Sequence, residues 1–425
     1  MASQEKVTYR QLFGNRGFTA LWVGQTISGI GDTFNFTALN FLAMSMNKGS
    51  GVPSAAPLLT MLMFNTLPYL IISPFAGVFA DRWDRKKTMI ATDLFRAVLV
   101  LLIPLATSLT QLYIIGFLMN VGRIFFLPCI RAALPNILTR EQLMLGNSAM
   151  STGHGFAETV GYFVGGTLVA VLGFNVAFYI DSASFFISAA MITMIVLPHV
   201  PAAKGKSLLE NVQTVFLNLR EGFAYISRHR IAQGVFMTNA LLQVCIASYN
   251  MLETVFVGET LGGGTAGFGL VAGTMTLGFL TGTLVFGGLA HRVNPFASYS
   301  WGILGMGIGI ALVGSSPNVP VAVVMAFLFG TINPFYFVPS TALLQSNVDN
   351  HILGRVFGLF NIINRLAIFL SALGTKSIQE SLHWPVGFTI QALGLAGAFG
   401  GVLALWWFRS ERKTVASKEV PAASA

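Results

Sequence analysis

Long apolar stretches alternate with short polar segments along the whole chain. Stretches of about 20 or more mostly apolar residues have the length that crosses the hydrocarbon core of a bilayer. Their backbone polar groups must be satisfied within the segment, and they are too long for barrel strands, so each is predicted to be a helix. The sequence therefore predicts an all-α membrane protein whose transmembrane helices lie near residues 17–46, 56–80, 88–108, 110–133, 147–172, 175–197, 230–258, 265–290, 296–314, 319–343, 352–375 and 385–408.

Composition supports this class and excludes others. Of the 425 residues, 54% are hydrophobic and 10% are charged, whereas a soluble domain carries roughly 25% charged residues. The two cysteines, Cys129 and Cys245, lie inside apolar stretches and share no metal-site spacing with histidines. Because no P-loop or catalytic constellation is present either, we expect neither an enzyme nor a cofactor or bound metal.

The basic residues predict the orientation. If the spans alternate in direction, nearly all lysines and arginines fall on one side, and Lys48 and Lys376 fall on the other. By the positive-inside rule the crowded side is the cytoplasm, which places both termini there in the plasma (inner) membrane. The net charge of +9 is then a topology signal and gives little support to nucleic-acid binding.

A polar segment after the sixth span separates the chain into two halves. Pro198 and Pro201 end that span, and apolar residues then recur at helical spacing between residues 208 and 226, which predicts an amphipathic helix at the cytoplasmic surface. We interpret it as a linker; a regulatory docking site is the alternative. The predicted organisation is a six-helix bundle over residues 1–198, a linker over 199–229, a second six-helix bundle over 230–408 and a cytoplasmic tail over 409–425.

Two short motifs suggest that the bundles are repeats and point to a family. The segment from Gly77 to Arg82 is echoed 210 residues later by the segment from Gly287 to Arg292, as expected of two parallel, pseudo-symmetric six-helix repeats. The loop Gly77-x-x-x-Asp81-Arg82-x-x-Arg85-Lys86-Lys87 between the second and third spans, together with the 6+6 arrangement, resembles the major facilitator superfamily, although Asp84 stands where a glycine is common.

The resemblance also favours a direction of transport. Gly161-Tyr162-Phe163-Val164-Gly165-Gly166 looks like the antiporter signature with tyrosine in the proline position. Leu21-Trp22-x-Gly24-Gln25-x-Ile27-Ser28 and Gly354-Arg355-Val356-Phe357 look most like the bacterial macrolide or multidrug and siderophore exporters. The resemblance implies a monomer that works by alternating access, with the substrate cavity between spans one, two, four and five and their counterparts.

A conformational latch is expected at the basic loop. A carboxylate such as Asp81 can accept hydrogen bonds at a helix start, where the dipole contributes roughly 0.3–1 kcal/mol. The resemblance implies that Asp81 makes this contact near Gly354, while the rest of the motif stabilises the loop. The alternative is a topology anchor without a switching role. The predicted latch residues are Gly77, Asp81, Arg82, Arg85, Lys86 and Gly354.

Charged residues inside the spans need a reason, because each costs on the order of 2.5–3.5 kcal/mol at a helix centre. We expect Asp32 and Glu158 to carry coupling protons; the alternative is that they form buried ion pairs with Arg123. Asp181 and Glu253 lie toward the outer span ends, where a gate or a solvated rim is expected. Asp93 and Arg96 are predicted to pair at i, i+3.

Amides, one aromatic ring and two arginines are the predicted substrate contacts. Such polar groups are expensive to face toward lipid, and hydrogen bonding between helices is the alternative for each amide. Arg365 is expected to meet an anionic substrate group or Glu253. The predicted substrate-binding residues are Gln25, Asn35, Phe36, Asn65, Arg123, Asn239, Gln243, Asn250, Asn361 and Arg365.

These features predict a secondary active transporter. With no nucleotide-binding domain, the energy must come from a gradient, and we expect a proton-coupled exporter of amphiphilic or hydrophobic small molecules in contact with membrane lipids. The alternatives are a lysolipid flippase, a siderophore or metal exporter on the same fold, and a membrane sensor that does not transport.

Overall fold

The chain is helical throughout the part that the structure describes. This structure is a computed structural model, and it describes residues 8–73, 75, 83–197, 208–290 and 292–411, among which no strand occurs. The chain forms two compact units, one of residues 1–46 and 64–213 and the other of residues 47–63 and 214–425. The expectation of an all-α protein is confirmed.

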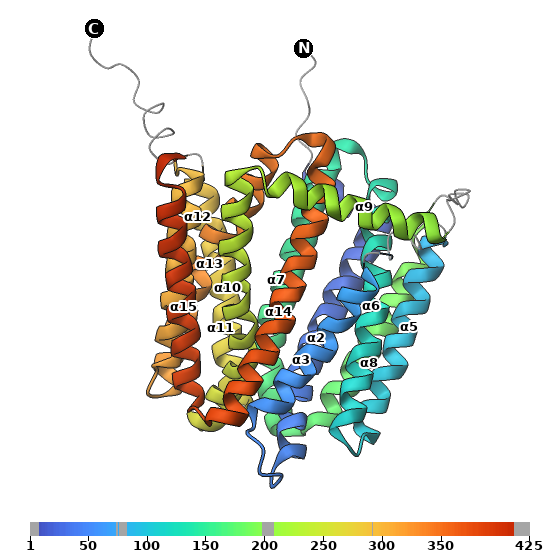
Figure 1. Cartoon of the computed structure of the whole chain (residues 1–425). Coiled ribbons are helices and arrows are strands. Elements are labelled where there is room, and N and C mark those ends of the chain that lie inside the picture. Colours follow the sequence, from blue (N-terminus) through green and yellow to red (C-terminus); the bar gives the residue numbers. More distant parts are fainter. Residues whose placement is uncertain (1–7, 74, 76–82, 198–207, 291, 412–425) are drawn as a thin grey trace. The chain divides into compact units, whose positions relative to one another are not determined.

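The first unit contains the helices that build the site (Figure 1). A one-turn helix, α1 (Tyr9–Phe13), precedes the long α2 (Arg16–Asn47), and the second half of α3 (Ala55–Ile71) also belongs to this unit. The remaining helices are α5 (Arg85–Leu102), α6 (Leu109–Ile137), α7 (Arg140–Leu172) and α8 (Phe174–Thr193).

The second unit is built from the later helices. Most of α9 (Leu208–Ile226) belongs to it, followed by α10 (Arg230–Val255), a π-helical turn at Phe256–Thr260 and α11 (Gly264–Leu289). The last helices are α12 (Pro295–Gly314), α13 (Val319–Asn347), α14 (Asn350–Leu382) and α15 (Val386–Trp407).

Ten of the described helices are long and apolar enough to cross a membrane, and α3 is a shorter apolar helix. The helix α2 contains Arg16 and Asp32 and extends over 32 residues. The predicted spans 147–172 and 352–375 each end too early on one side. The helix α7 begins at Arg140 rather than near residue 147, and α14 ends at Leu382 rather than near residue 375. The count of apolar residues missed these turns because they contain polar residues. At the start of α7, a capping box between Thr139 and Gln142 supports the added turns of that helix.

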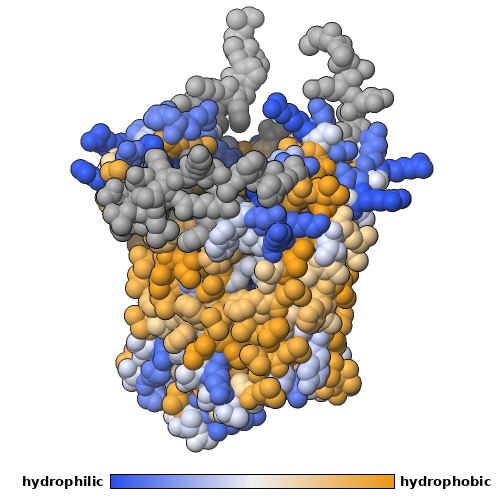
Figure 2. Space-filling model, turned by 90° about the vertical axis from the view of Figure 1, so that its right-hand side faces the viewer, coloured by the Kyte–Doolittle hydropathy of each residue, from blue (hydrophilic) through white to orange (hydrophobic). Residues whose placement is uncertain are grey.

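Exposed apolar side chains form the outer face of α5 and α8. Figure 2 shows a broad hydrophobic band on this face, with hydrophilic side chains gathered beyond both of its ends. Phe95 and Val98 on α5 and Tyr179 and Phe186 on α8 each expose more than two fifths of their surface. Soluble proteins rarely expose a contiguous apolar patch that extends over two neighbouring helices, so this face is a lipid-contacting surface.

The predicted amphipathic helix exists as α9, and its end is tied to the start of α14. The guanidinium of Arg355 donates to the Glu221 carboxylate, and the Tyr225 hydroxyl accepts from the backbone N–H of Asp349 at 3.4 Å. The Glu221 and Arg355 side chains remain 51% and 38% exposed. The pair therefore joins α9 to α14 at a place that water can reach.

We expect the Glu221 and Arg355 pair to contribute less than about 1 kcal/mol, because exposed ion pairs are screened by water. A double-mutant cycle with Glu221→Gln and Arg355→Gln, read from melting temperatures in detergent, measures this coupling. A coupling energy well above that value would contradict this expectation and would mean that the pair stabilises the second unit.

Candidate functional site

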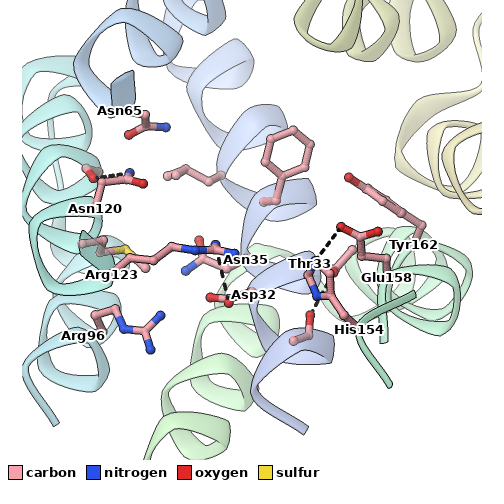
Figure 3. A pocket seen from close by; sticks show the side chains of 15 residues that line it. Asp32, Thr33, Asn35, Asn65, Arg96, Asn120, Arg123, His154, Glu158 and Tyr162 are labelled. Atoms are coloured by element: carbon pink, nitrogen blue, oxygen red, sulfur yellow. Dashed lines mark hydrogen bonds and ion pairs between the residues drawn. The ribbon is translucent and has the colours of Figure 1, made fainter. Parts of the chain in front are cut away.

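A polar pocket lies inside the first unit. Its volume is about 260 Å³, and its walls come from α2, α3, α5, α6 and α7 (Figure 3). A neighbouring pocket of about 230 Å³ shares Asp32, Arg96, Arg123 and His154 with it and adds Trp22 and Gln25. The charged side chains that line the two pockets are Asp32, Arg96, Arg123 and Glu158.

Small residues on α7 allow this helix to approach α2 closely. A Cβ atom added to Gly161 would lie 2.6 Å from the Cβ of Thr33, and one added to Gly165 would lie 2.8 Å from the Phe34 ring. Gly29 on α2 faces Ala157 in the same way, at 3.0 Å. Ala157, Gly161 and Gly165 therefore form the face of α7 that contacts α2. The residues beside this face, His154, Glu158 and Tyr162, line the pocket.

Asp32 and Arg123 face each other across the pocket. Their Oδ2 and Nη1 atoms are 3.9 Å apart, and the side chains are 28% and 41% exposed. In Figure 3 the guanidinium of Arg123 reaches from α6 toward the carboxylate of Asp32 on α2. The alternative expectation of a buried ion pair is therefore wrong about burial: the pair exists, but it is open to the pocket.

Glu158 pairs with a histidine. His154, one turn earlier on α7, places Nε2 at 3.4 Å from Oε1 of Glu158, and the side chains are 60% and 43% exposed. The ion pair of Glu158 with Arg123, which was the alternative to proton coupling, is not the one that forms among the described residues. His154 is not among the residues predicted from the sequence, although its i, i+4 spacing to Glu158 is the signal that points to it.

The predicted contacts of the first unit converge on these pockets. Asn35, Phe36, Asn65 and Arg123 line the first, and Gln25 lines the second. The Phe36 ring meets Tyr162 edge to face with centroids 6.3 Å apart, and the buried Oδ1 of Asn65 has no hydrogen-bond partner within the described protein. Such an acceptor in a pocket wall is available to a ligand or to water.

A second polar layer extends inward from Arg96, which lines both pockets. Arg96 pairs with Asp93 at 2.5 Å, as expected, and stacks on the Phe185 ring with its Cζ atom 4.2 Å from the centroid. The Ser188 hydroxyl donates to Asp93 at 2.7 Å and accepts from the Gln25 amide at 3.0 Å. This chain of hydrogen bonds connects a pocket residue on α2 to a buried ion pair on α5.

The expectation of a solvated rim is wrong for two carboxylates. Asp181 is fully buried, and Glu253 is 2% exposed. Both lie within helices that pack against several neighbours, so their distance from the span centre did not bring them into contact with water. Asp181 accepts a hydrogen bond from the Asn35 amide at 2.6 Å instead.

The predicted contacts of the second unit are more dispersed. Asn239 is buried, donates to Asn364 at 2.5 Å and accepts from the Tyr336 hydroxyl, so it joins α10 to α13 and α14. Asn361 is exposed and donates to the carbonyl of Phe357 on its own helix at 3.0 Å. Three further candidates are partly buried, namely Gln243, Asn250 and Arg365. Their role as substrate contacts stays a prediction.

The basic loop is described only from Trp83 onward. Gly77, Asp81 and Arg82 lie outside the described residues, and on α14 a Cβ atom added to Gly354 would meet nothing within 4 Å. Lys86 donates to the carbonyls of Thr193 and Ile195 at 2.7 Å each. The latch itself stays a prediction.

Two further details of the loop are resolved by the structure. The Nη1 of Arg85 donates to the carbonyl of Ala132 at 3.3 Å. Asp84, which replaces the usual glycine, has an extended backbone with φ at −63° and caps α5 by accepting from the N–H of Lys87 at 3.0 Å. No left-handed backbone is needed at that position, so the aspartate is compatible with the turn.

Comparisons with known proteins agree with this architecture. Residues 21–372 and 249–424 match the profile of the Major Facilitator Superfamily. The chain is 25% identical over 400 residues to the uncharacterized MFS-type transporter YfiS of Bacillus subtilis, covering 90% of this chain and 91% of that protein. It is 26% identical over 382 residues to macrolide efflux protein A of Streptococcus pyogenes, covering 86% and 91%.

Solved structures share the fold. The nucleoside transporter NupG superposes with a TM-score of 0.66 at 15% identity, covering 92% of this chain and 98% of its own. The peptide transporter POT in complex with sulfate gives 0.70 at 13% identity, covering 96% and 98%.

The helices, the lipid-contacting face and the charged pocket define a multi-pass membrane transporter. The chain belongs to the Major Facilitator Superfamily.

Proposed function

We propose that this protein is a proton-coupled exporter of amphiphilic small molecules. The observation that carries the proposal is the pocket of the first unit, which two ionisable pairs line: Asp32 with Arg123, and Glu158 with His154. Because both pairs are partly exposed to the pocket, a proton or a charged substrate can reach them.

Competition between protons and substrate for the same carboxylates would couple proton movement to substrate movement. A proton on Asp32 removes its charge and releases Arg123, whereas a cationic substrate stabilises the ionised form. Protons and substrate then occupy the site alternately, which is the requirement of an antiporter working by alternating access. Glu158 and His154 provide a second proton-binding pair on the facing helix.

An amphiphilic substrate suits the lining. Phe36, Met119 and Tyr162 offer apolar and aromatic surface beside the carboxylates. The similarity to macrolide efflux protein A points in the same direction. The alternatives are less well supported. The charged lining does not favour the acyl chain that a flippase would hold. No group of three or more His, Cys, Asp or Glu side chains that could bind a metal occurs among the described residues, and a non-transporting sensor is not supported.

The remaining parts of the proposal come from the sequence. We place the protein in the inner membrane as a monomer with twelve spans, with six-helix bundles over residues 1–198 and 230–408 and both termini in the cytoplasm. The positive-inside distribution of lysine and arginine supports this orientation.

Transport into proteoliposomes under an imposed pH gradient tests the proposal. The panel is a macrolide, a lipophilic cation and a lysolipid. Gradient-dependent uptake of the macrolide or the cation is expected. Movement of lysolipid alone would favour the flippase, and uptake that ignores the gradient for every compound would contradict proton coupling.

The latch makes a separate prediction. If Asp81 holds one conformation closed, Asp81→Asn is expected to reduce transport about tenfold, the effect of roughly 1.4 kcal/mol, with normal membrane insertion. Asp84→Asn is the control, since its amide oxygen can still cap α5 and should leave transport unchanged. Normal transport by Asp81→Asn would leave only the topology role.

A further inference from the structure

We infer that Asp181 is a buried proton-binding site behind the pocket, which holds a proton in this conformation and exchanges it through Asn35. The inference deepens the proposed function and rests on it for its role in transport. The site lies between α2 and α8 in the first unit, and sequence analysis assigned Asp181 only to a gate or rim.

Two fully buried carboxylates of this unit differ in their partners. Asp93 and Asp181 are both 0% exposed. Asp93 has the guanidinium of Arg96 at 2.5 Å, whereas Asp181 forms no ion pair among the described residues. An isolated carboxylate out of contact with water is so costly that it takes up a proton instead.

The charges around Asp181 favour the same state. The groups that act on it electrostatically are Asp32 on α2, which is a carboxylate itself, and Arg96 on α5, which is already paired with Asp93. On α7, Glu158 and His154 pair with each other, and α8 carries no other charged residue. No packed element thus supplies an unpaired cation within the described residues.

The hydrogen bonds locate the proton on Oδ1. Oδ2 accepts from the Asn35 amide at 2.6 Å. At the other oxygen, Oδ1, the Ser184 hydroxyl donates only at 3.4 Å, because the same hydroxyl also donates to the backbone carbonyl of Asp181 at 2.7 Å. A hydroxyl has one hydrogen to donate, so an ionised carboxylate would have a short donor on Oδ2 alone, and we place the proton on Oδ1.

Close packing explains why the site is sealed and how it opens. A Cβ atom added to Gly31 would lie 2.6 Å from Oδ1, so α2 covers the carboxyl with a bare backbone. Asn35 lines the pocket and binds Asp181 at the same time. When the Asn35 side chain turns into the pocket, water takes its place beside the carboxyl group. The carboxyl group then turns so that its O–H faces that water, and the O–H bond breaks with transfer of the proton to the water, which leaves an ionised carboxylate.

Infrared difference spectroscopy of the reconstituted full-length protein tests the inference. At neutral pH we expect the C=O stretch of a protonated carboxyl group, absent from Asp181→Asn and retained in Asp93→Asn. Asn35→Leu should shift the band to higher frequency, because Oδ2 loses its donor. The band should also shift in D₂O, because the proton exchanges through the pocket.

Stability and transport supply independent readouts. Asparagine reproduces the hydrogen bonds of the protonated acid, so Asp181→Asn should melt at the wild-type temperature and move substrate down its gradient but lose the response to pH. A band that survives in Asp181→Asn, a band that does not shift in D₂O, or a pH response that the wild type shows and Asp181→Asn retains in full would each overturn the inference.

The two proposals fail separately. If wild-type transport ignores the pH gradient while the Asp181 band exchanges in D₂O, proton-coupled export is wrong and the proton-binding site stands. If transport follows the gradient and Asp181→Asn leaves the band intact, export stands and the site is wrong.

Discussion

Asp32→Asn is expected to abolish transport driven by a pH gradient and to leave the protein folded. A pair of charges about 4 Å apart attracts by up to about 4 kcal/mol in an environment of effective dielectric constant 20. Asp32 and Arg123 are partly exposed to the pocket, however, so their net contribution to stability is about 0–1 kcal/mol. The substitution should therefore impair proton coupling rather than stability, because the amide cannot exchange a proton. Uptake under the gradient should drop about tenfold or more, which corresponds to at least roughly 1.4 kcal/mol.

A second ion pair provides the matched control. Lys376 and Glu380 on α14 have the same 3.9 Å separation, and their side chains are 29% and 42% exposed, but neither lines the pocket. Glu380→Gln should transport like the wild type in the same proteoliposomes. If Asp32→Asn keeps the full response to the gradient, the carboxylate is structural and the coupling acid must be sought elsewhere.

Gly161→Leu is expected to prevent stable folding of the first unit. Even a Cβ atom at this position would lie 2.6 Å from the Thr33 Cβ and 2.9 Å from its Cγ2, both close to the backbone of α2. Overpacking of this kind costs typically about 1–3 kcal/mol, and leucine adds three more carbons to the same contact. We expect the variant to accumulate poorly in the membrane and Gly161→Ala to show a lowered melting temperature in detergent.

The control for this substitution is another glycine within a long helix. Gly374 on α14 is exposed, and a Cβ atom added there would meet nothing within 4 Å. Gly374→Leu should therefore accumulate normally. Normal accumulation of Gly161→Leu would mean that α2 and α7 do not approach closely, and the pocket geometry would then be wrong.

Much of the fold could be predicted from the chain itself. Helices in lipid satisfy their own backbone, and their side chains face an apolar solvent, so apolar length alone locates them. The i, i+3 pair of Asp93 and Arg96 was equally predictable, because its geometry is local to one helix. The ends of α7 and α14 were not, since polar turns beyond the apolar stretch carry no such signal.

The candidate site, too, could be predicted only in part. The class of protein, its family resemblance and the unusual acids at Asp32 and Glu158 could be predicted from the chain, because a charge in an apolar span is conspicuous wherever it lies. Their partners depend on the packing of the helices: Arg123 for Asp32, His154 for Glu158, and for Asp181 the Asn35 amide without a cation. Burial and pairing depend on which helix faces lie together, and in these helices the α2 to α7 and α2 to α8 contacts are set by glycines whose role appears only once the backbones meet.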